Sequence, residues 1–328
     1  MKTIWSPLVG APLSRTVRPP AAVRRWIGRR TWKQSLWRAV VLGLWLWAGG
    51  AVSQAQLQVN PSDGSCSFYF GLFQHPVVAV RDPALAPGET EQLLTIVTQA
   101  QAAAAATANL PAQQRPKARR EVAQATVEVL EEFVSEHPGS VWAPSLRANL
   151  GKYWRERERY TPALKHWAAA WEATRQAPNG PAKQVADYAL AHLARLLSNL
   201  CRLEVLTPLL EETRQLVLDQ GPLSQTMCRT WEAAVKMSRN PTACYRCGVL
   251  AVHNVARALG QPYYHPQDVL PTPATPHGCS LAMLAELAGR ARLGLVAAQR
   301  VSGEELVVPS VAHLRQNHYV TVVGRRGE

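Results

Sequence analysis

A chain of 328 residues is long enough for two domains, each with a buried core. Its formal net charge of +13 is of the size found in nucleic-acid-binding proteins, so the distribution of that charge matters. Residues 1–38 hold nine basic residues and no acidic one, and the remaining 27 basic residues are offset by 23 acidic ones. A net charge of +4 over the body of the chain leaves no extended basic face and excludes nucleic-acid binding.

A short apolar segment follows this basic region. Residues 39–48 are apolar but fewer than the roughly 20 that a membrane-spanning helix needs, and small residues follow at Ser53 and Ala55. This order is typical of a secretory signal peptide, so residues 1–55 are predicted to direct export, with cleavage near Ala55. We expect a periplasmic, cell-surface or secreted protein that meets the membrane only transiently. The alternatives are an anchor formed by the same apolar residues and a twin-arginine signal, which residues 29–33 resemble.

The pattern then changes twice. Residues 56–88 contain Pro, Gly and Asp at short intervals, which predicts an irregular linker. From residue 89 the apolar positions follow helical spacing, and helices are predicted over 89–110 and 117–135.

The clearest repeat signal consists of two small and two large residues. Gly151 and Ala163 would let two helices approach closely, and Trp154 and Trp167 would fill the groove around them. These offsets resemble those of tetratricopeptide repeats, and a weaker copy follows 43 residues later. We therefore expect residues 89–235 to form an α-helical, tetratricopeptide-like solenoid that offers a surface to a protein partner. A generic helical bundle is the alternative.

A cysteine followed by a glycine begins the next apolar segment. The apolar positions after Cys247 have helical spacing, which places this cysteine at the start of a buried helix. The free N–H groups and the dipole at a helix start favour a thiolate, which is the nucleophilic form of cysteine. His318, about 70 residues downstream in a β-branched segment, is the candidate general base.

The segment 238–328 carries an ordered series of motifs. Cys247-Gly comes first, Gly278-Cys-Ser-Leu precedes a predicted helix over 280–292, and strand-like stretches lead to His318-Tyr-Val-Thr-Val-Val. The series resembles cysteine peptidase family 39, the papain-like bacteriocin-processing (double-glycine) peptidases. It is most similar to the secreted variety that precedes rearrangement-hotspot repeats.

The resemblance implies a papain-like α+β domain, incomplete at its C-terminus, with Cys247 as nucleophile and His318 as general base. It also implies a peptide or protein substrate, cut in the chain itself or in an exported peptide, without metal or other cofactor. His313 lies in the same segment and is expected to pack rather than to react. His253, six residues beyond Cys247, is expected in the core or at the surface.

Three positions depart from the family's pattern. The family has a glutamine before the cysteine that donates to the oxyanion, whereas residues 236–246 contain no glutamine and offer only Asn240 as a substitute. Arg246 stands where the family commonly has an acid. The family's aspartate follows the last strand, whereas the sole acid after His318 is Glu328. The alternative function is therefore a secreted, non-catalytic scaffold or binding protein with a degenerate peptidase module.

The spacing of Cys244 and Cys247 permits two further interpretations. A Cys-x-x-Cys pair at a helix start is typical of a redox dithiol, although thioredoxin-like proteins place that motif after a strand. A zinc site would need two more ligands, which Cys279 with His265 or His277 would supply at loose spacing.

Overall fold

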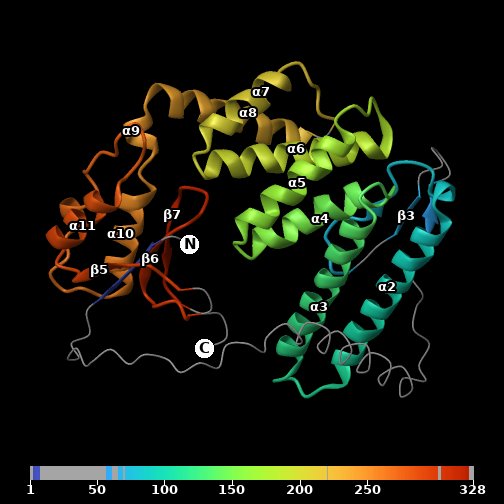
Figure 1. The fold of residues 1–328 in the computed structure, drawn as a ribbon, viewed down its shortest axis with the longest axis horizontal. Helices are drawn as coiled ribbons and strands as arrows, with labels where there is room; N and C mark the ends of the chain where they lie inside the picture. Colours follow the sequence, from blue (N-terminus) through green and yellow to red (C-terminus); the bar gives the residue numbers. More distant parts are fainter. Residues whose placement is uncertain are drawn as a thin grey trace, which may run out of the picture. The chain divides into compact units, whose positions relative to one another are not determined.

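The computed structural model describes residues 3–7, 57–60, 66–68, 71–219, 221–301 and 304–324. This part of the chain is largely helical and contains small antiparallel sheets (Figure 1). Its residues divide into two compact units, which we treat separately. The helical unit comprises the described residues of Thr16–Leu193, and the cysteine unit comprises those of Met1–Arg15 and Ala194–Glu328.

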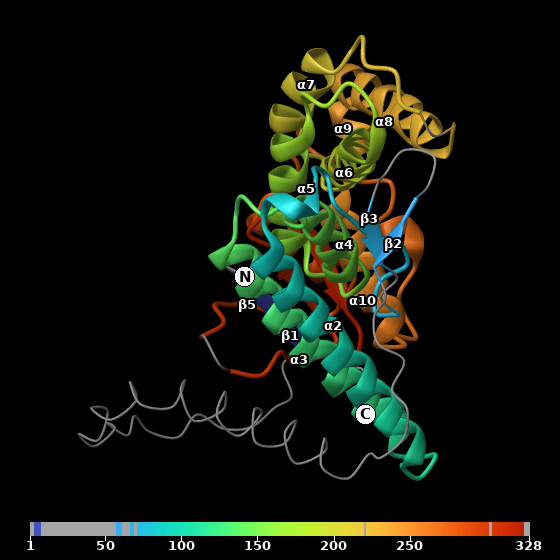
Figure 2. The same cartoon turned by 90° about the vertical axis from the view of Figure 1, so that its right-hand side faces the viewer.

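The helical unit begins with a three-stranded sheet in the order β2-β3-β4 and continues through successive helices. The strands are β2 (Gln58–Val59), β3 (Cys66–Phe68) and β4 (Val77–Val78). The helices are η1 (Pro83–Leu85), α2 (Pro87–Ala106), η2 (Thr107–Asn109), α3 (Arg115–Glu136), α4 (Ala143–Glu156), α5 (Tyr160–Thr174) and α6 (Gly180–Asn199), the last of which continues into the cysteine unit. Figure 2 shows α2 and α3 side by side as a long hairpin.

The segment 56–88 differs from the irregular linker that its composition predicts. Its small sheet packs on α4, because the Val78 amide donates to Ser145 Oγ at 3.0 Å and Phe68 is buried with its ring centroid 5.4 Å from that of Trp142. Strands of two or three residues show too little alternation for the sequence to reveal them. The segment therefore belongs to the core of the helical unit.

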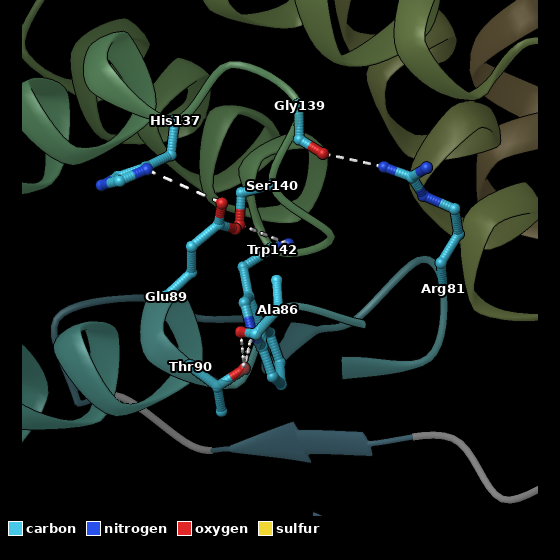
Figure 3. Close-up of polar contacts among 8 residues, drawn as sticks. All are labelled: Arg81, Ala86, Glu89, Thr90, His137, Gly139, Ser140 and Trp142. Carbon is cyan, nitrogen blue, oxygen red and sulfur yellow. Dashed lines mark hydrogen bonds and ion pairs between the residues drawn. The ribbon is translucent and has the colours of Figure 1, made fainter. Parts of the chain in front are cut away.

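Polar contacts join the start of α2 to the loop that follows α3 (Figure 3). Trp142 Nε1 donates to Thr90 Oγ1 at 3.0 Å, which satisfies the one polar group of a fully buried indole. His137 Nδ1 lies 3.7 Å from Glu89 Oε1. These contacts hold the N-terminal turn of α2 against the chain that leads into α4.

The predicted contact between Gly151 and Trp167 is confirmed. A methyl group at Gly151 would lie 2.5 Å from two atoms of the Trp167 indole, which is itself 1% exposed. Ala163 is fully buried in α5. Trp154 differs in part, since it is only partly buried and its Nε1 donates to Glu131 Oε1 of α3 at 2.7 Å. Trp154 therefore links α4 to the preceding helix, α3.

The cysteine unit combines helices with a four-stranded antiparallel sheet in the order β5-β1-β6-β7. Its strands are β1 (Thr3–Pro7), β5 (Leu295–Ala298), β6 (Ser310–His313) and β7 (Tyr319–Val322). Its helices are α7 (Leu203–Glu212), α8 (Gly221–Arg239), α9 (Pro241–Cys244), α10 (Cys247–Ala258), η3 (Pro266–Asp268) and α11 (Leu281–Arg290). The predicted helices beginning at Cys247 and near Ser280 are thus confirmed.

Strand β1 lies between β5 and β6, in the segment that the sequence assigns to export. Thr3 pairs with His313 and Ile4 pairs with both Ala298 and Ala312, so the N-terminal strand joins two C-terminal ones. The predicted cleavage position and the apolar residues 39–48 lie outside the described residues. Among the described residues, no helix has the length and apolarity that crossing a bilayer requires.

The core of the cysteine unit lies between α10, α11 and the sheet (Figure 1). Val249, Val252 and Val255 repeat at helical spacing along α10 and are each no more than 1% exposed. Thr321 Oγ1 of β7 donates to the Ala251 carbonyl at 3.0 Å and fixes the strand against the helix. This arrangement positions the two ends that matter for the site, the start of α10 and the start of β7.

Candidate functional site

Cys247 is the first residue of α10, as the sequence predicts. Its side chain packs against the apolar core and is partly exposed. The sulfur accepts hydrogen bonds from the backbone amides of Tyr319 and Gly248 and from the backbone amide of Cys247 itself. The first two N–H groups of α10 have no partner within the helix, so they are available to a sulfur at this position.

The contact with Tyr319 brings the two predicted site residues to one place. Tyr319 directly follows His318, and its amide nitrogen lies about 2.4 Å from the Cα atom of His318 by covalent geometry. A hydrogen bond from this amide to the Cys247 sulfur therefore places the backbone of His318 beside the thiol. The contact is made by the amide of the residue after His318, and the His318 ring takes no part in it.

The charge state of Cys247 differs from the thiolate that a helix start predicts. Burial raises the pKa of the Cys247 thiol, and the hydrogen bonds from Tyr319 and Gly248 oppose this shift without cancelling it. Desolvation disfavours the charged form of any group. For this thiol, packed into an apolar core, the rise in pKa caused by desolvation is larger than the decrease caused by the amide hydrogen bonds. Cys247 is therefore a neutral thiol in the resting protein.

His318 lies at the end of the hairpin loop between β6 and β7. The loop turns at Asn317, whose φ of 55° is left-handed, and the Leu314 amide donates to the His318 carbonyl at 2.8 Å. Burial lowers the pKa of His318, and the neighbouring His313 lowers it further. Its Nδ1 atom is buried and has no hydrogen-bond partner among the described residues. Neither the Cys247 thiol nor a carboxylate therefore holds this nitrogen.

The other two histidines named from the sequence have structural contacts. The ring of His313 stacks on Tyr319 with 4.4 Å between centroids, which agrees with its expected packing role. His253 Nδ1 lies 2.6 Å from the Tyr264 hydroxyl, on a different turn of α10 from Cys247. Both contacts serve packing.

The three departures from the family's pattern have structural roles. Asn240 caps α9, because its Oδ1 accepts from the Ala243 amide at 3.3 Å, and this exposed side chain is committed to the helix start. Arg246 donates to the Leu270 carbonyl and so holds the loop after α10. Glu328 lies outside the described residues.

Cys279, which the sequence suggests only as a possible zinc ligand, is a neighbour of the Cys247 region in the structure. It lies just before α11, and its Sγ donates to the Tyr245 carbonyl at 3.7 Å. A methyl group at Gly248 would lie 2.8 Å from Cys279 Cβ, so only glycine permits this approach. The glycine after Cys247 was the available signal, since a close contact is one reason for a glycine inside a helix.

The zinc alternative receives no support from the geometry. In the described residues, no three histidine, cysteine, aspartate or glutamate side chains come close enough together to hold a metal ion. His265 and His277, the proposed partners of Cys279, are exposed.

A cavity with a volume of about 890 Å³ lies in the helical unit. It is bounded mainly by one face of α2, including Thr90, Leu94 and Thr98, by Cys66 of β3 and by Leu57, which precedes β2. We assign it no chemistry.

Comparisons with protein-family models, curated protein sequences and solved structures find no match to the chain.

Proposed function

We propose that the protein is an exported, cysteine peptidase-like hydrolase in which Cys247 attacks a peptide bond and His318 acts as general base. The observation that carries this proposal is the hydrogen bond between the Tyr319 amide and the Cys247 sulfur, because it joins the start of α10 to the start of β7. The residues 89–235 are proposed to form a tetratricopeptide-like solenoid, and the residues 238–328 a papain-like domain. The Gly151–Trp167 contact and the helix-then-sheet order of the cysteine unit support these assignments.

The mechanism starts from a neutral pair. Burial raises the pKa of Cys247 and lowers that of His318, so the proton resides on sulfur and the imidazole is a free base. As the sulfur attacks the carbonyl carbon, His318 takes the thiol proton and then passes it to the leaving amine. Water hydrolyses the thioester and returns both groups to their first state. The amides of Gly248 and Tyr319 stabilise the thiolate that forms when His318 takes the proton, before the sulfur bonds to the carbonyl carbon.

A non-catalytic scaffold is the second candidate, and one observation favours it. His318 Nδ1 is buried without a partner in the described residues, whereas an active pair needs a group that orients the ring. In this alternative the cysteine unit is a degenerate peptidase module, and the helical unit binds a protein partner.

Peptide-library cleavage separates the two functions. The reduced, full-length protein is incubated with a mixture of unstructured peptides, and new N-termini are identified by mass spectrometry. We expect cleavage that is lost in Cys247→Ser and His318→Ala and retained in the matched control Cys244→Ser. Equal cleavage by the parent and Cys247→Ser, or none by the parent, overturns the peptidase proposal and leaves the scaffold.

We propose export because residues 1–55 contain a basic region, then a short apolar segment, then small residues. The measurement is N-terminal sequencing of protein recovered outside the cytoplasm, which should begin between about Ser53 and Gln58. Protein that retains Met1 and fractionates with the membrane contradicts export by cleavage and favours the anchor.

A further inference from the structure

Four cysteines gather around the start of α10. Cys279 Sγ contacts the Tyr245 carbonyl, and Cys244 and Cys247 lie on either side of that residue in the chain. Burial, together with the negative charge of a Cys247 or Cys244 thiolate, raises the pKa of Cys201 to about 11, so this fourth thiol is also a neighbour. All four are free thiols. Oxidation would join two of these thiols in a disulfide, and the geometry indicates which two.

Cys247 and Cys279 both lie beside the backbone of Gly248. The Gly248 amide donates a hydrogen bond to the sulfur of each. A methyl group at Gly248 would lie 2.8 Å from Cys279 Cβ and 3.2 Å from its Sγ, so this cysteine lies directly against the backbone beside Cys247. Two sulfurs that accept from one amide are themselves neighbours. Both side chains pack against the same apolar core.

We propose that Cys247 and Cys279 form a reversible dithiol site that a low-molecular-weight disulfide, such as oxidised glutathione, converts into an intramolecular disulfide. The pairing differs from the Cys244–Cys247 pair that the Cys-x-x-Cys spacing favours. Disulfide formation does not depend on peptidase activity. Its consequence does rest on the proposed function, because an oxidised Cys247 has no thiol with which to attack a peptide.

The reaction is a two-step thiol–disulfide exchange. One protein thiolate attacks glutathione disulfide, forms a mixed disulfide and releases one glutathione thiolate. The second protein thiolate attacks the protein sulfur of the mixed disulfide and releases the other glutathione. The two protein thiols lose two protons and two electrons, and the glutathione disulfide gains both to become two thiols. Burial raises the pKa of Cys247 and of Cys279, so the rate should increase with pH.

Cys244 is the less favourable partner for Cys247. It lies at the end of α9, before the turn residues Tyr245 and Arg246 that lead into α10. Cys279, in contrast, lies directly against Gly248, the residue next to Cys247.

Tryptic mapping tests the pairing in the full-length protein. The reduced chain is treated with oxidised glutathione at about pH 8, near the pKa of a free thiol, and the remaining thiols are alkylated. Arg246 separates Cys244 from Cys247, so trypsin releases them in peptides 240–246 and 247–257, and Cys279 in peptide 258–290. We expect peptide 247–257 to be recovered linked to 258–290, and the link to disappear after reduction with dithiothreitol.

Two serine variants control the experiment. Cys279→Ser should lose the linked peptide completely and leave Cys247 as its glutathione mixed disulfide, which also shows that the site is still accessible. Cys244→Ser should retain the link. Linkage of 247–257 to 240–246, or to the Cys201 peptide 196–202, overturns the inference. So does an unlinked Cys247 when the exposed Cys228 in peptide 215–229 is glutathionylated.

The outcome is independent of the peptidase proposal. A Cys247–Cys279 link in a protein whose reduced form cleaves no peptide supports the dithiol site and overturns the peptidase. Cleavage by the reduced form without any such link does the reverse.

Discussion

Cys247 and His318 are neutral for the same physical reason. Burial disfavours a charged thiolate and a charged imidazolium alike, so the pKa of Cys247 rises while that of His318 falls. The sequence places Cys247 at a helix start, where a thiolate is favoured, but it contains no direct measure of how deeply the sulfur is buried. The position of Cys247 at the start of its helix was therefore predictable from the sequence, and the charge state of its sulfur was not.

His318 should make the stability of the protein depend on pH. Its folded-state pKa is lowered, so below the unfolded value of about 6.5 the unfolded chain binds the proton more readily. The free energy of unfolding should then fall as pH drops from about 7.5 toward 5.5, and His318→Gln should reduce that dependence. Urea titrations at both pH values measure it.

The control for this experiment is His277→Gln, since His277 is exposed. It should retain the full pH dependence of the parent. A parent-like slope in His318→Gln would show that the ring is solvated in solution.

Gly151 offers a sharp test of packing in the helical unit. The added methyl group of Gly151→Ala meets the Trp167 indole at 2.5 Å, and a fully buried ring has little room to move. We expect a loss of about 1–3 kcal/mol in the free energy of unfolding, the usual range for overpacking. Trp167→Ala should lose about 3–5 kcal/mol at the same place. Urea denaturation measures both.

Gly88→Ala is the matched control, because this glycine also lies in a helix and nothing lies within 4 Å of the added methyl. It should leave stability unchanged or raise it by up to about 1 kcal/mol, since alanine restricts the unfolded chain. Equal effects at positions 88 and 151 would contradict the close approach of α4 and α5.

At the scale of elements, long amphipathic helices were predictable and short strands were not. The predicted helix 117–135 appears as α3, and the predicted stretch at Tyr319–Val322 appears as β7. Among the strand-like stretches that precede His318 in the sequence, the one at 305–311 forms a strand only from Ser310 onward, and residues 304–307 have irregular backbone. Periodicity needs several residues to become visible, whereas a strand of two or four residues is fixed by its partners in space.

The contact between β7 and α10 should depend in part on one hydroxyl. Thr321→Val keeps the β-branched shape and removes the hydrogen bond from Oγ1 to the Ala251 carbonyl. Because that carbonyl is at a helical position and keeps its other lone pair, we expect a loss of about 0.5–1.5 kcal/mol in the free energy of unfolding. Thermal denaturation followed by circular dichroism measures it.

Thr226→Val is the matched control, because its Oγ1 donates to the Pro222 carbonyl within α8 and the residue is not part of the sheet. Its effect should be smaller. A larger loss at position 226 than at 321 would show that the strand is held to α10 by apolar packing alone.

At the scale of the whole chain, the sheet and the proposed export segment involve the same residues. Cleavage near Ala55 would remove β1, and β5 and β6 would each lose a neighbouring strand. In hydrogen exchange, a chain of residues 53–328 should therefore lose amide protection over 295–298 and 310–313 relative to the full chain. Helix α8 (Gly221–Arg239) is the internal reference and should exchange alike in both. Identical protection of β5 and β6 in the two chains would contradict the pairing.

The pairing of Thr3 with His313 implies a long delay between the synthesis of β1 and the synthesis of its partner β6. Strand β1 is among the first segments made, and its partner β6 is made about 310 residues later. At about 5–20 residues per second, β1 waits some 15–60 s before β6 is available. If residues 1–55 direct export as proposed, a targeting factor that binds the N-terminus has that interval in which to act before the sheet can form. Under the export proposal, the long sequence separation of β1 and β6 therefore lets targeting compete with folding: export wins if the targeting factor binds before β6 is made.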